Sequence, residues 1–320
     1  MPVTAEASRV GAQAQGATES SLKALDSTGV RLERVCVARE MTSKVGPRSF
    51  LHAGPPISLA DIPGPMRGAI IGGLLFEGEA RDVAEAEAII DSGEIEISPC
   101  HDAGGLGAMA GIITPNMPVA VARSDSHTTF APLNEGTDGA VRYGSYDDRT
   151  LARLRWMASD MVAVLDEAVQ AGEPLDLVDL IAEGLRRGDE CHNRLVATTA
   201  NLIVRFAPSF IRSKRGEAAE KVAAFMSGNG HFALPFAIAM AKALTLSAAN
   251  VAGSPVVTAM SANGREFGIR VSGTGDRWFV APSPVGEPKL VPGARIEDIT
   301  PTMGDSMISE TAGFGAFAMT

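Results

Sequence analysis

The run GDECHNR at residues 188–194 holds the densest group of reactive side chains, between two apolar stretches with helical spacing. If Gly188 ends one helix and Asp189 caps the next, the first turn of the second helix holds Glu190, Cys191, His192 and Asn193. The free N–H groups and positive dipole end of such a turn would bind an anion, lower a thiol pKa and keep His192 neutral as a base. The alternative is a well-capped helix whose His192 and Arg194 bond nearby backbone. The high density of reactive side chains in this run favours a functional site.

A second reactive group is the run CHDAGGLG at residues 100–107. Two Cys-His pairs in the chain suggest zinc, but adjacent strand residues point to opposite faces and the spacings of zinc sites are absent, so we expect no metal. The glycines also resemble a dinucleotide fingerprint, yet Pro115 and Pro118 leave no room for its crossover helix. We therefore expect a loop that approaches an oxyanion or phosphate, with His101 and Asp102 at its mouth and backbone donors at Gly104, Gly105 and Gly107.

Further polar residues occur in short motifs along the chain. Arginines offer forked donors for carboxylate or phosphate, and the glycine turn SGNGHF brings an asparagine and a histidine to the start of a helix. Taken singly, each of these residues is typical of an ion pair, a solvated charge or a turn. Together they predict a binding site for a small anion, and the candidates are Arg67, Glu135, Arg142, Asn229, His231, Asn263, Arg277 and Glu310.

The elements that must position these residues follow from apolar periodicity and turn signals. Short helices at 63–76 and 83–91 alternate with strands at 94–98 and 119–123. From residue 147 the apolar residues recur at helical spacing, with Asp147 or Asp148 as the cap, and a second helix with Asp176 as its cap ends at Gly188. A third helix is expected from 195 to Pro208.

The last third of the chain returns to mixed structure. A long apolar helix is expected at about 231–249, and Asn263-Gly264 between two strand-like runs predicts a β-hairpin at 256–273. We therefore predict an α+β fold, with mixed α/β parts at both ends and a helical subdomain between them. The predicted units are a mobile N-terminal tail at 1–30, an α/β domain with the glycine-rich loop at 31–144, the helical subdomain at 145–226 and an α/β domain with the hairpin at 227–320.

Composition limits the classes of partner. The 320 residues carry a formal charge of −10, with a pI near 5.1, so no basic surface is available for nucleic acid or an anionic membrane. Three cysteines without a CxxC spacing indicate a reduced, cytoplasmic protein, and the polar N-terminus lacks the apolar core of a signal peptide. The apolar stretch 232–249 contains Lys242, which favours a buried helix over a membrane span.

Several enzyme classes lack their signatures. The chain has no GxxxxGK[ST] loop, no GxSxG elbow and no HExxH motif. Nucleotide hydrolysis through a P-loop, α/β-hydrolase catalysis and zinc proteolysis are therefore not indicated.

Long segments from about residue 30 to the end resemble one known family. They include LHAGPPISLADIPGPMRG, PCHDAGGLGAMAGIITPNMPV, LNEG, GDECHNR, SGNGHF, TAMSANGREFGIRVSGTGDRWF and GDSMISETAGFGAFAM. Together they are similar to the AllG/YlbE-type subunits associated with oxamate carbamoyltransferase in anaerobic allantoin breakdown. The resemblance implies an α+β fold with a helical insert and carbamoyl transfer between carbamoyl phosphate and oxamate, with oxalurate phosphorolysis as the physiological direction. It also implies FdrA-like and AllH-like partner subunits, with homo-oligomers left open, and a nearby carbamate kinase. The N-terminal segment is shorter than in family members, and the loop after His101 is glycine-rich where theirs is rich in histidine and proline.

Residue roles in such a reaction can be assigned as hypotheses. His192 is the first choice for the base and His101 the second, with Glu190 orienting a histidine. Arg194 and Arg67 would hold carboxylate or phosphate, and the loop at 104–107 would donate to the developing oxyanion. No cofactor is expected beyond carbamoyl phosphate as co-substrate, and the motifs of aspartate-type and ornithine-type carbamoyltransferases are absent, so the site would be convergent. The alternatives are a non-catalytic subunit that supports an FdrA-like partner, or an amide hydrolase using His101 with Cys100 or Cys191.

Overall fold

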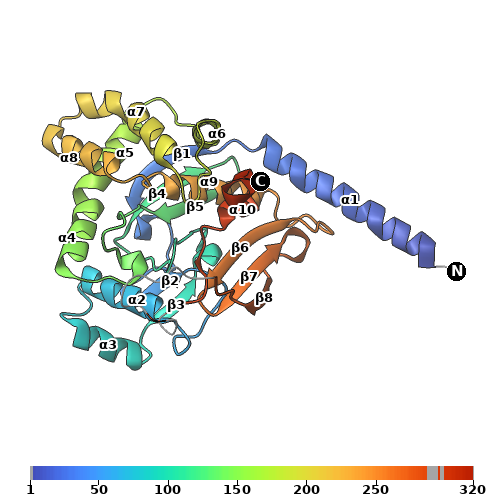
Figure 1. Cartoon of the computed structure of the whole chain (residues 1–320), viewed down its shortest axis with the longest axis horizontal. Coiled ribbons are helices and arrows are strands. Elements are labelled where there is room, and N and C mark those ends of the chain that lie inside the picture. Colours follow the sequence, from blue (N-terminus) through green and yellow to red (C-terminus); the bar gives the residue numbers. More distant parts are fainter. Residues whose placement is uncertain (1–2, 287–294, 296–298, 320) are drawn as a thin grey trace.

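The computed structural model describes residues 3–286, 295 and 299–319, and shows the mixed α+β fold that the sequence predicts (Figure 1). The strands of the described part form three small sheets with the orders β1-β4-β5, β2-β3 and β8-β7-β6-β9. Their bounds are β1 Arg31–Val37, β2 Ser49–His52, β3 Glu96–Pro99, β4 Pro118–Arg123, β5 Thr128–Pro132, β6 Val257–Asn263, β7 Glu266–Val271, β8 Trp278–Pro282 and β9 Met303–Gly304. All neighbouring strands in these sheets are antiparallel except the parallel pair β2 and β3.

The helices follow the expected order along most of the chain. They are α1 Val3–Ser27, α2 Gly64–Glu77, α3 Val83–Asp91, α4 Asp148–Trp156, α5 Val162–Ala171, α6 Leu177–Arg186, α7 Val196–Arg212, α8 Gly216–Ser227, α9 Leu234–Ser247 and α10 Ile308–Thr311. A π-helical turn, Met157–Met161, joins α4 to α5. The predicted caps are present, because Asp147 accepts a hydrogen bond from the Thr150 N–H and Asp176 accepts one from the Asp179 N–H.

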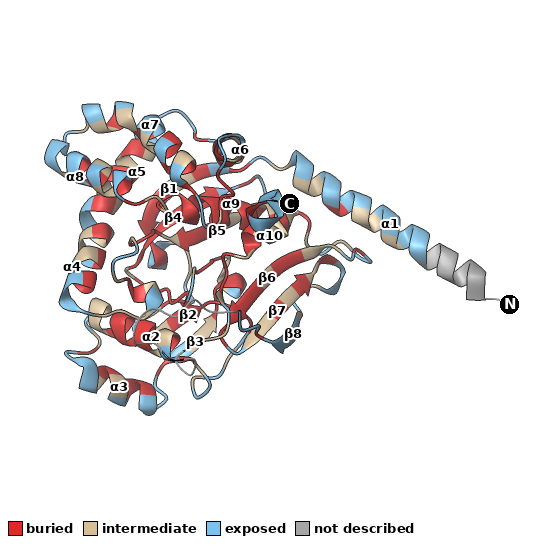
Figure 2. Cartoon of the chain, viewed as in Figure 1, coloured by how far each residue is buried: buried red, intermediate tan, exposed pale blue. Residues whose placement is uncertain are grey.

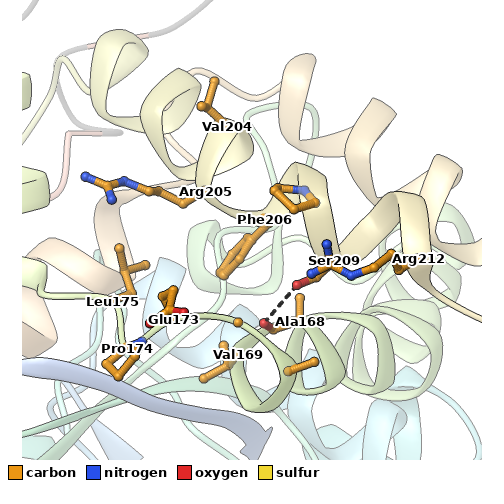
Figure 3. A pocket seen from close by; sticks show the side chains of 13 residues that line it. Ala168, Val169, Glu173, Pro174, Leu175, Val204, Arg205, Phe206, Ser209 and Arg212 are labelled. Carbon is orange, nitrogen blue, oxygen red and sulfur yellow. Dashed lines mark hydrogen bonds between the residues drawn. The ribbon is translucent and has the colours of Figure 1, made fainter.

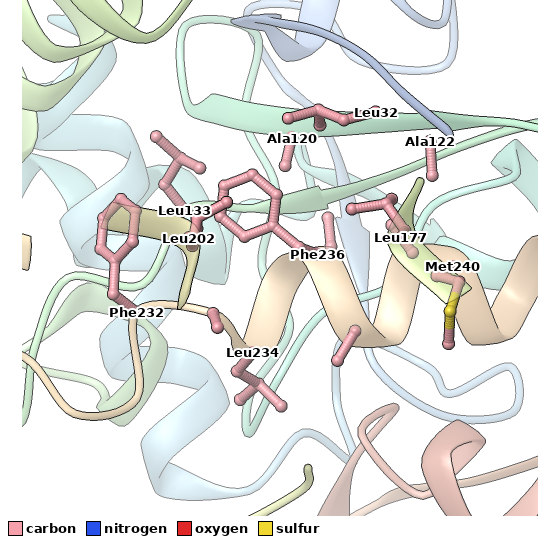
Figure 4. Close-up of a cluster of buried hydrophobic side chains, with 14 of the residues drawn as sticks. Leu32, Ala120, Ala122, Leu133, Leu177, Leu202, Phe232, Leu234, Phe236 and Met240 are labelled. Carbon is pink, nitrogen blue, oxygen red and sulfur yellow. The ribbon is translucent and has the colours of Figure 1, made fainter. Parts of the chain in front are cut away.

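The apolar helix α9 lies at the centre of the molecule, packed on β4 and β5. Ala120 and Ala122 of β4 present small side chains, and Phe236 of α9 points into the space beside them (Figure 4). A helix that is apolar on all sides is stable only when it is covered on all sides, which this position provides. No helix within the described residues is long and apolar enough to cross a membrane.

Two helices differ from the expected pattern. The N-terminal residues, expected to be a mobile tail, form α1, which extends away from the body of the molecule (Figures 1 and 2). The alanines of this segment favour helix, and Ser21 near its C-terminal end is buried, with its Oγ 2.7 Å from Ser254 Oγ. Helix α7 continues past Pro208 to Arg212, because Pro208 lies on the solvent side while Phe206 and Ser209 keep packing inward.

Helices α6 and α7 cross at Gly184, where an added Cβ would collide with Thr198 Oγ1. That hydroxyl is held by Asp189 Oδ2 at 2.8 Å, so it cannot move without losing a buried hydrogen bond. We expect Gly184→Ala to lower the free energy of unfolding by about 1–3 kcal/mol, although alanine is the better helix former. Urea unfolding measures the change.

Gly228→Ala is the matched control for this prediction. At Gly228, which ends α8, the nearest heavy atom to an added Cβ is 3.6 Å away, an ordinary contact. Its effect should stay within about 0.5 kcal/mol. Equal losses for the two variants would show that the close crossing of α6 and α7 is not the cause.

Candidate functional site

A buried group of charged side chains lies where elements from three parts of the chain meet. His101 belongs to the 3-10 turn Cys100–Ala103 after β3, Lys242 to α9, and Asp305 to the segment after β9. His101 Nδ1 lies 2.9 Å from Lys242 Nζ, and His101 Nε2 lies 3.4 Å from Asp305 Oδ1. The side chains of His101 and Asp305 are fully buried, so these interactions are little screened by solvent.

The electrostatics of this group define the protonation state of His101. Burial and the neighbouring charge of Lys242 lower the pKa of His101 to about 4. Burial and the charge of Arg270 lower the pKa of Lys242 to about 8. At neutral pH Lys242 is therefore mostly an ammonium that donates to Nδ1 of a neutral ring, which leaves the ring proton on Nε2.

Asp305 is the buried anion that balances Lys242. Its Oδ1 accepts from the Gly54 N–H at 2.9 Å, its Oδ2 accepts from the Gly107 N–H at 2.8 Å, and the Ser261 hydroxyl donates to Oδ1. Burial alone would raise the pKa of Asp305, but the interaction with His101 and these hydrogen bonds hold it below its ordinary value. Asp305 is therefore ionised at neutral pH.

A cavity of about 400 Å³ opens beside His101. Its wall includes Arg270 of β7, whose guanidinium stacks on the Trp278 ring with 4.4 Å between Cζ and the ring centroid. Arg270 also pairs with Asp102, and its Nη1 lies 3.6 Å from the exposed carboxylate of Asp276.

Unpaired nitrogens gather around this cavity. His101 Nε2, Arg270 Nε and Trp278 Nε1 are buried without a hydrogen-bond partner among the residues that the structure describes. Lys44, which also lines the cavity, donates to the Asp102 carbonyl at 2.7 Å. All three nitrogens are covered by protein, and Asp305 Oδ1 lies 3.4 Å from His101 Nε2, so a ligand in the cavity would reach these donors only after the surrounding side chains moved.

The glycine loop differs from the expectation in one respect. It does lie beside His101 and Asp102, but its N–H groups already donate within the protein, Gly104 to His101 O, Gly105 to Cys100 O, Leu106 to Phe130 O and Gly107 to Asp305 Oδ2. The backbone donors proposed for an oxyanion are therefore occupied in this structure. The loop positions Asp305 instead.

The GDECHNR run is not the first turn of a helix. Residues 189–195 form a loop between α6 and α7, and Asp189 caps α7 from a distance by accepting from the Thr198 N–H at 2.7 Å. Glu190 does not orient a histidine, since its Oε1 accepts from the backbone N–H groups of His192, Asn193 and Arg194. The orienting carboxylate is Glu310, whose oxygens lie 2.9 Å and 3.0 Å from His192 Nδ1.

The cysteines are not activated thiols. Cys191 is fully buried, and burial raises its pKa to about 11, the opposite of the lowered value expected at a helix N-terminus. Burial also raises the pKa of Cys100 well above its ordinary value. Both thiols are therefore protonated at neutral pH, which argues against the cysteine hydrolase alternative. Within the described residues, no three His, Cys, Asp or Glu side chains form a group that could hold a metal ion.

Two of the predicted motifs meet in a second buried polar cluster. Asn229 Nδ2 donates to Asn134 Oδ1 at 3.1 Å, which joins the SGNGHF turn to the LNEG motif. Glu135 accepts from the Val141 N–H at 3.0 Å and lies 3.9 Å from Arg142 Nη1. Burial raises the pKa of Glu135. Asn229 and Glu135 therefore stabilise the loops between β5 and α4.

The remaining candidates do not join either group. The Arg67 guanidinium is occupied by Glu87 and Asp91 of α3, and the exposed Arg277 stacks on Phe279. Asn263 holds the hairpin, since its Oδ1 accepts from the Arg265 and Glu266 N–H groups. The exposed Arg194 donates to the Gly188 carbonyl and the Met319 sulfur, and His231 is placed by a hydrogen bond from its N–H to Asn229 Oδ1.

Five residues of the cavity region were absent from the predicted site, namely Lys44, Lys242, Arg270, Trp278 and Asp305. One signal could have found Lys242, because a lone charge in an otherwise apolar helix must have a buried partner. For the others the sequence contains no comparable signal. Their proximity depends on contacts between segments far apart in the chain.

Comparison with known proteins assigns the chain to a family. The family model described as oxamate carbamoyltransferase subunit AllG matches residues 95–306. The oxamate carbamoyltransferase subunit AllG of Escherichia coli (strain K12) is 40% identical over 85% of this chain and 66% of its own length. The uncharacterized protein YahG of the same organism is 37% identical over 90% of this chain and 61% of its own length.

A solved structure shares the fold of this chain. The crystal structure of a conserved protein of unknown function from Enterococcus faecalis V583 has a TM-score of 0.91 and 35% identity, and covers 97% of this chain and 75% of that one. The two E. coli relatives are longer than this chain, which spans slightly less than two thirds of the length of each. From the model match and these identities, the chain belongs to the family of oxamate carbamoyltransferase subunits typified by AllG.

Proposed function

We propose that this chain is a subunit of a carbamoyltransferase that acts on carbamoyl phosphate and oxamate, and on oxalurate in the reverse direction. The observation that carries the proposal is the cavity beside His101, whose wall includes the cationic side chains of Arg270 and Lys44. The name of the E. coli relative supplies the substrate class. All of these substrates are small anions, which such a cavity suits.

Arg270 and Lys44 are the proposed anion-binding residues. Asp276 is 94% exposed and lies 3.6 Å from Arg270 Nη1, so a phosphate or carboxylate can replace it there at little cost. Trp278 fixes the guanidinium plane from one side, which leaves its edge for an anion.

His101 is the proposed donor to the carbamoyl carbonyl oxygen. Its Nδ1 is filled by Lys242, so the neutral ring carries its proton on Nε2, which faces Asp305 Oδ1 at 3.4 Å and must turn from that carboxylate to donate to the substrate. A neutral imidazole in this state stabilises negative charge that develops on oxygen. This role differs from that of the base, for which His101 was the second choice. His192, the first choice for the base, keeps that role as the alternative, because Glu310 engages its Nδ1 and leaves Nε2 as the nitrogen that accepts a proton.

In the proposed reaction the oxamate nitrogen attacks the carbamoyl carbon, and a C–N bond forms. Asp102, on the cavity wall, takes the proton from that nitrogen, while the bond from carbon to the phosphate oxygen breaks. Phosphate leaves toward Arg270 and Lys44, and oxalurate is the other product. FdrA-like and AllH-like chains are the proposed partner subunits.

The test is to incubate the purified chain with labelled carbamoyl phosphate and oxamate, alone and with the FdrA-like and AllH-like subunits, and to follow oxalurate and phosphate. If the chain alone forms oxalurate, the result supports a complete active site within this chain. Product only from the mixture, and lost when the chain is omitted, supports a required subunit. A mixture that is equally active without this chain, or that forms no oxalurate, overturns the proposal.

A further inference from the structure

Helix α7 has an apolar face toward solvent. Val196, Val204 and Ile211 are 65%, 70% and 85% exposed. Ala200 and Pro208, also exposed, lie between them at spacings that continue the same face. We call these five residues the α7 stripe. The opposite face of α7 is buried through Leu202 and Phe206, so the helix is apolar on both sides although one side is open to water.

The α7 stripe borders a cavity of about 310 Å³ between α7 and the end of α5. Its wall includes Val204 of the stripe, the inward-pointing Phe206, and Leu175 of the loop after α5 (Figure 3). A depression of this size beside an exposed apolar helix can take an anchoring side chain from a partner.

Two arginines flank the cavity without acidic partners. Arg205 and Arg212 lie on opposite sides of it (Figure 3), and neither makes an ion pair or side-chain hydrogen bond with a described residue. Both lie on the same edge of the α7 stripe, because they follow Val204 and Ile211 directly and are two helical turns apart. Glu173 is the carboxylate among the described lining residues, so the two arginines leave this surface net positive.

Asn201 adds an unpaired donor on that edge. It lies one helical turn before Arg205, is 7% exposed, and its Nδ2 has no partner within the described part of the chain. That nitrogen is covered by protein and is not open to a partner. The donors that face solvent along this edge are the exposed Arg205 and Arg212, and a helix with carboxylates two turns apart presents acceptors to both.

We propose that the α7 stripe and its cavity dock an acidic amphipathic helix from a different protein chain. Apolar side chains of that helix cover the stripe, one of them enters the cavity, and carboxylates two turns apart pair with Arg205 and Arg212. A second copy of this chain does not fit. The exposed Arg194 precedes α7, Arg212 ends it and the exposed Lys214 follows it, so when two copies of the helix pack in either relative direction, cations meet cations.

The test uses two labelled synthetic peptides of about 20 residues, long enough to form a helix. Both carry leucines along one face, and they differ only in glutamate or lysine at the flanking positions. Fluorescence anisotropy with the full chain should show at least about tenfold tighter binding of the glutamate peptide, the equivalent of about 1.4 kcal/mol. Equal binding of the two peptides, or no binding of the glutamate peptide, overturns the proposal.

Variants place the binding on α7. Val204→Glu with Ile211→Glu should abolish binding of the glutamate peptide, and Arg205→Glu with Arg212→Glu should reverse the preference to the lysine peptide. Val83→Glu, at a site 39% exposed on α3, is the matched control and should bind as the wild type does. Binding by the Val204 and Ile211 variant at wild-type strength overturns the proposal. Stronger binding to phosphatidylserine vesicles than to the glutamate peptide also overturns it, in favour of a membrane surface.

Discussion

Replacing His101 by alanine should lower carbamoyl transfer by the assembled enzyme about 100-fold to 1,000-fold, the usual effect of losing one donor to a developing oxyanion. Its Nε2–H is the proposed donor to the substrate oxygen, and in this structure it lies 3.4 Å from Asp305 Oδ1. The loss should appear in kcat/KM for both carbamoyl phosphate formation and oxalurate formation, because both directions pass through the same transition state.

His101→Gln distinguishes a donor from a base. A glutamine amide can place an N–H close to the position of Nε2 but cannot accept a proton, so the donor role predicts partial recovery of the rate over the alanine variant. Equal inactivity of the two variants would return His101 to the role of base. His192→Ala is the second control, and a larger loss there than in His101→Ala would move the site to the GDECHNR loop.

The pH profile supplies a separate readout for the same site. With its pKa near 4, His101 stays neutral through the neutral range, so its own titration should not change the rate there. Lys242 has a pKa of about 8, and above that value it loses the proton that fixes the His101 ring. Wild-type activity should therefore be level near neutral pH and fall above about pH 8. Thermal melts of His101→Ala, His101→Gln and His192→Ala show whether a loss of activity in these variants comes from a loss of folding.

Local structure was largely predictable because its causes are local. The cap residues Asp147 and Asp176, the apolar run of α9 and the Asn263-Gly264 turn each act on residues within one or two turns of themselves. The N-terminal helix was missed because polarity was interpreted as absence of structure, while the intrinsic preference of alanine for helix was given no weight.

The site was less predictable because its geometry depends on contacts over long sequence distances. His101 and Asp102 were identified from residue type, and the structure places both on one cavity wall. Lys242 and Asp305 complete that site from more than a hundred residues away, and no spacing rule links them to the loop. The density of reactive types in GDECHNR was a weaker guide, since most of those groups bond within their own loop or to the C-terminal segment.

Asp305→Ala should have the largest effect on stability. The substitution leaves the N–H groups of Gly54 and Gly107 and the Ser261 hydroxyl without their acceptor, and leaves Lys242 as a buried charge without its counter-ion. Breaking a buried pair in this way costs about 3–5 kcal/mol. Urea unfolding at neutral pH measures the loss. Asp125→Ala, at an exposed carboxylate, is the matched control and should change the free energy of unfolding by less than about 0.5 kcal/mol.

The pH dependence of that difference tests its electrostatic origin. The pKa of Asp305 is lower in the folded protein than its ordinary value, so the unfolded chain binds the proton more readily. The stability that the ionised carboxylate contributes is therefore fully present above about pH 4 and is lost as the pH falls through its folded pKa. The gap in unfolding free energy between wild type and Asp305→Ala should narrow in acid. A gap that stays constant from neutral to acid pH would mean that the hydrogen bonds and packing of Asp305, rather than its charge, hold the segments together.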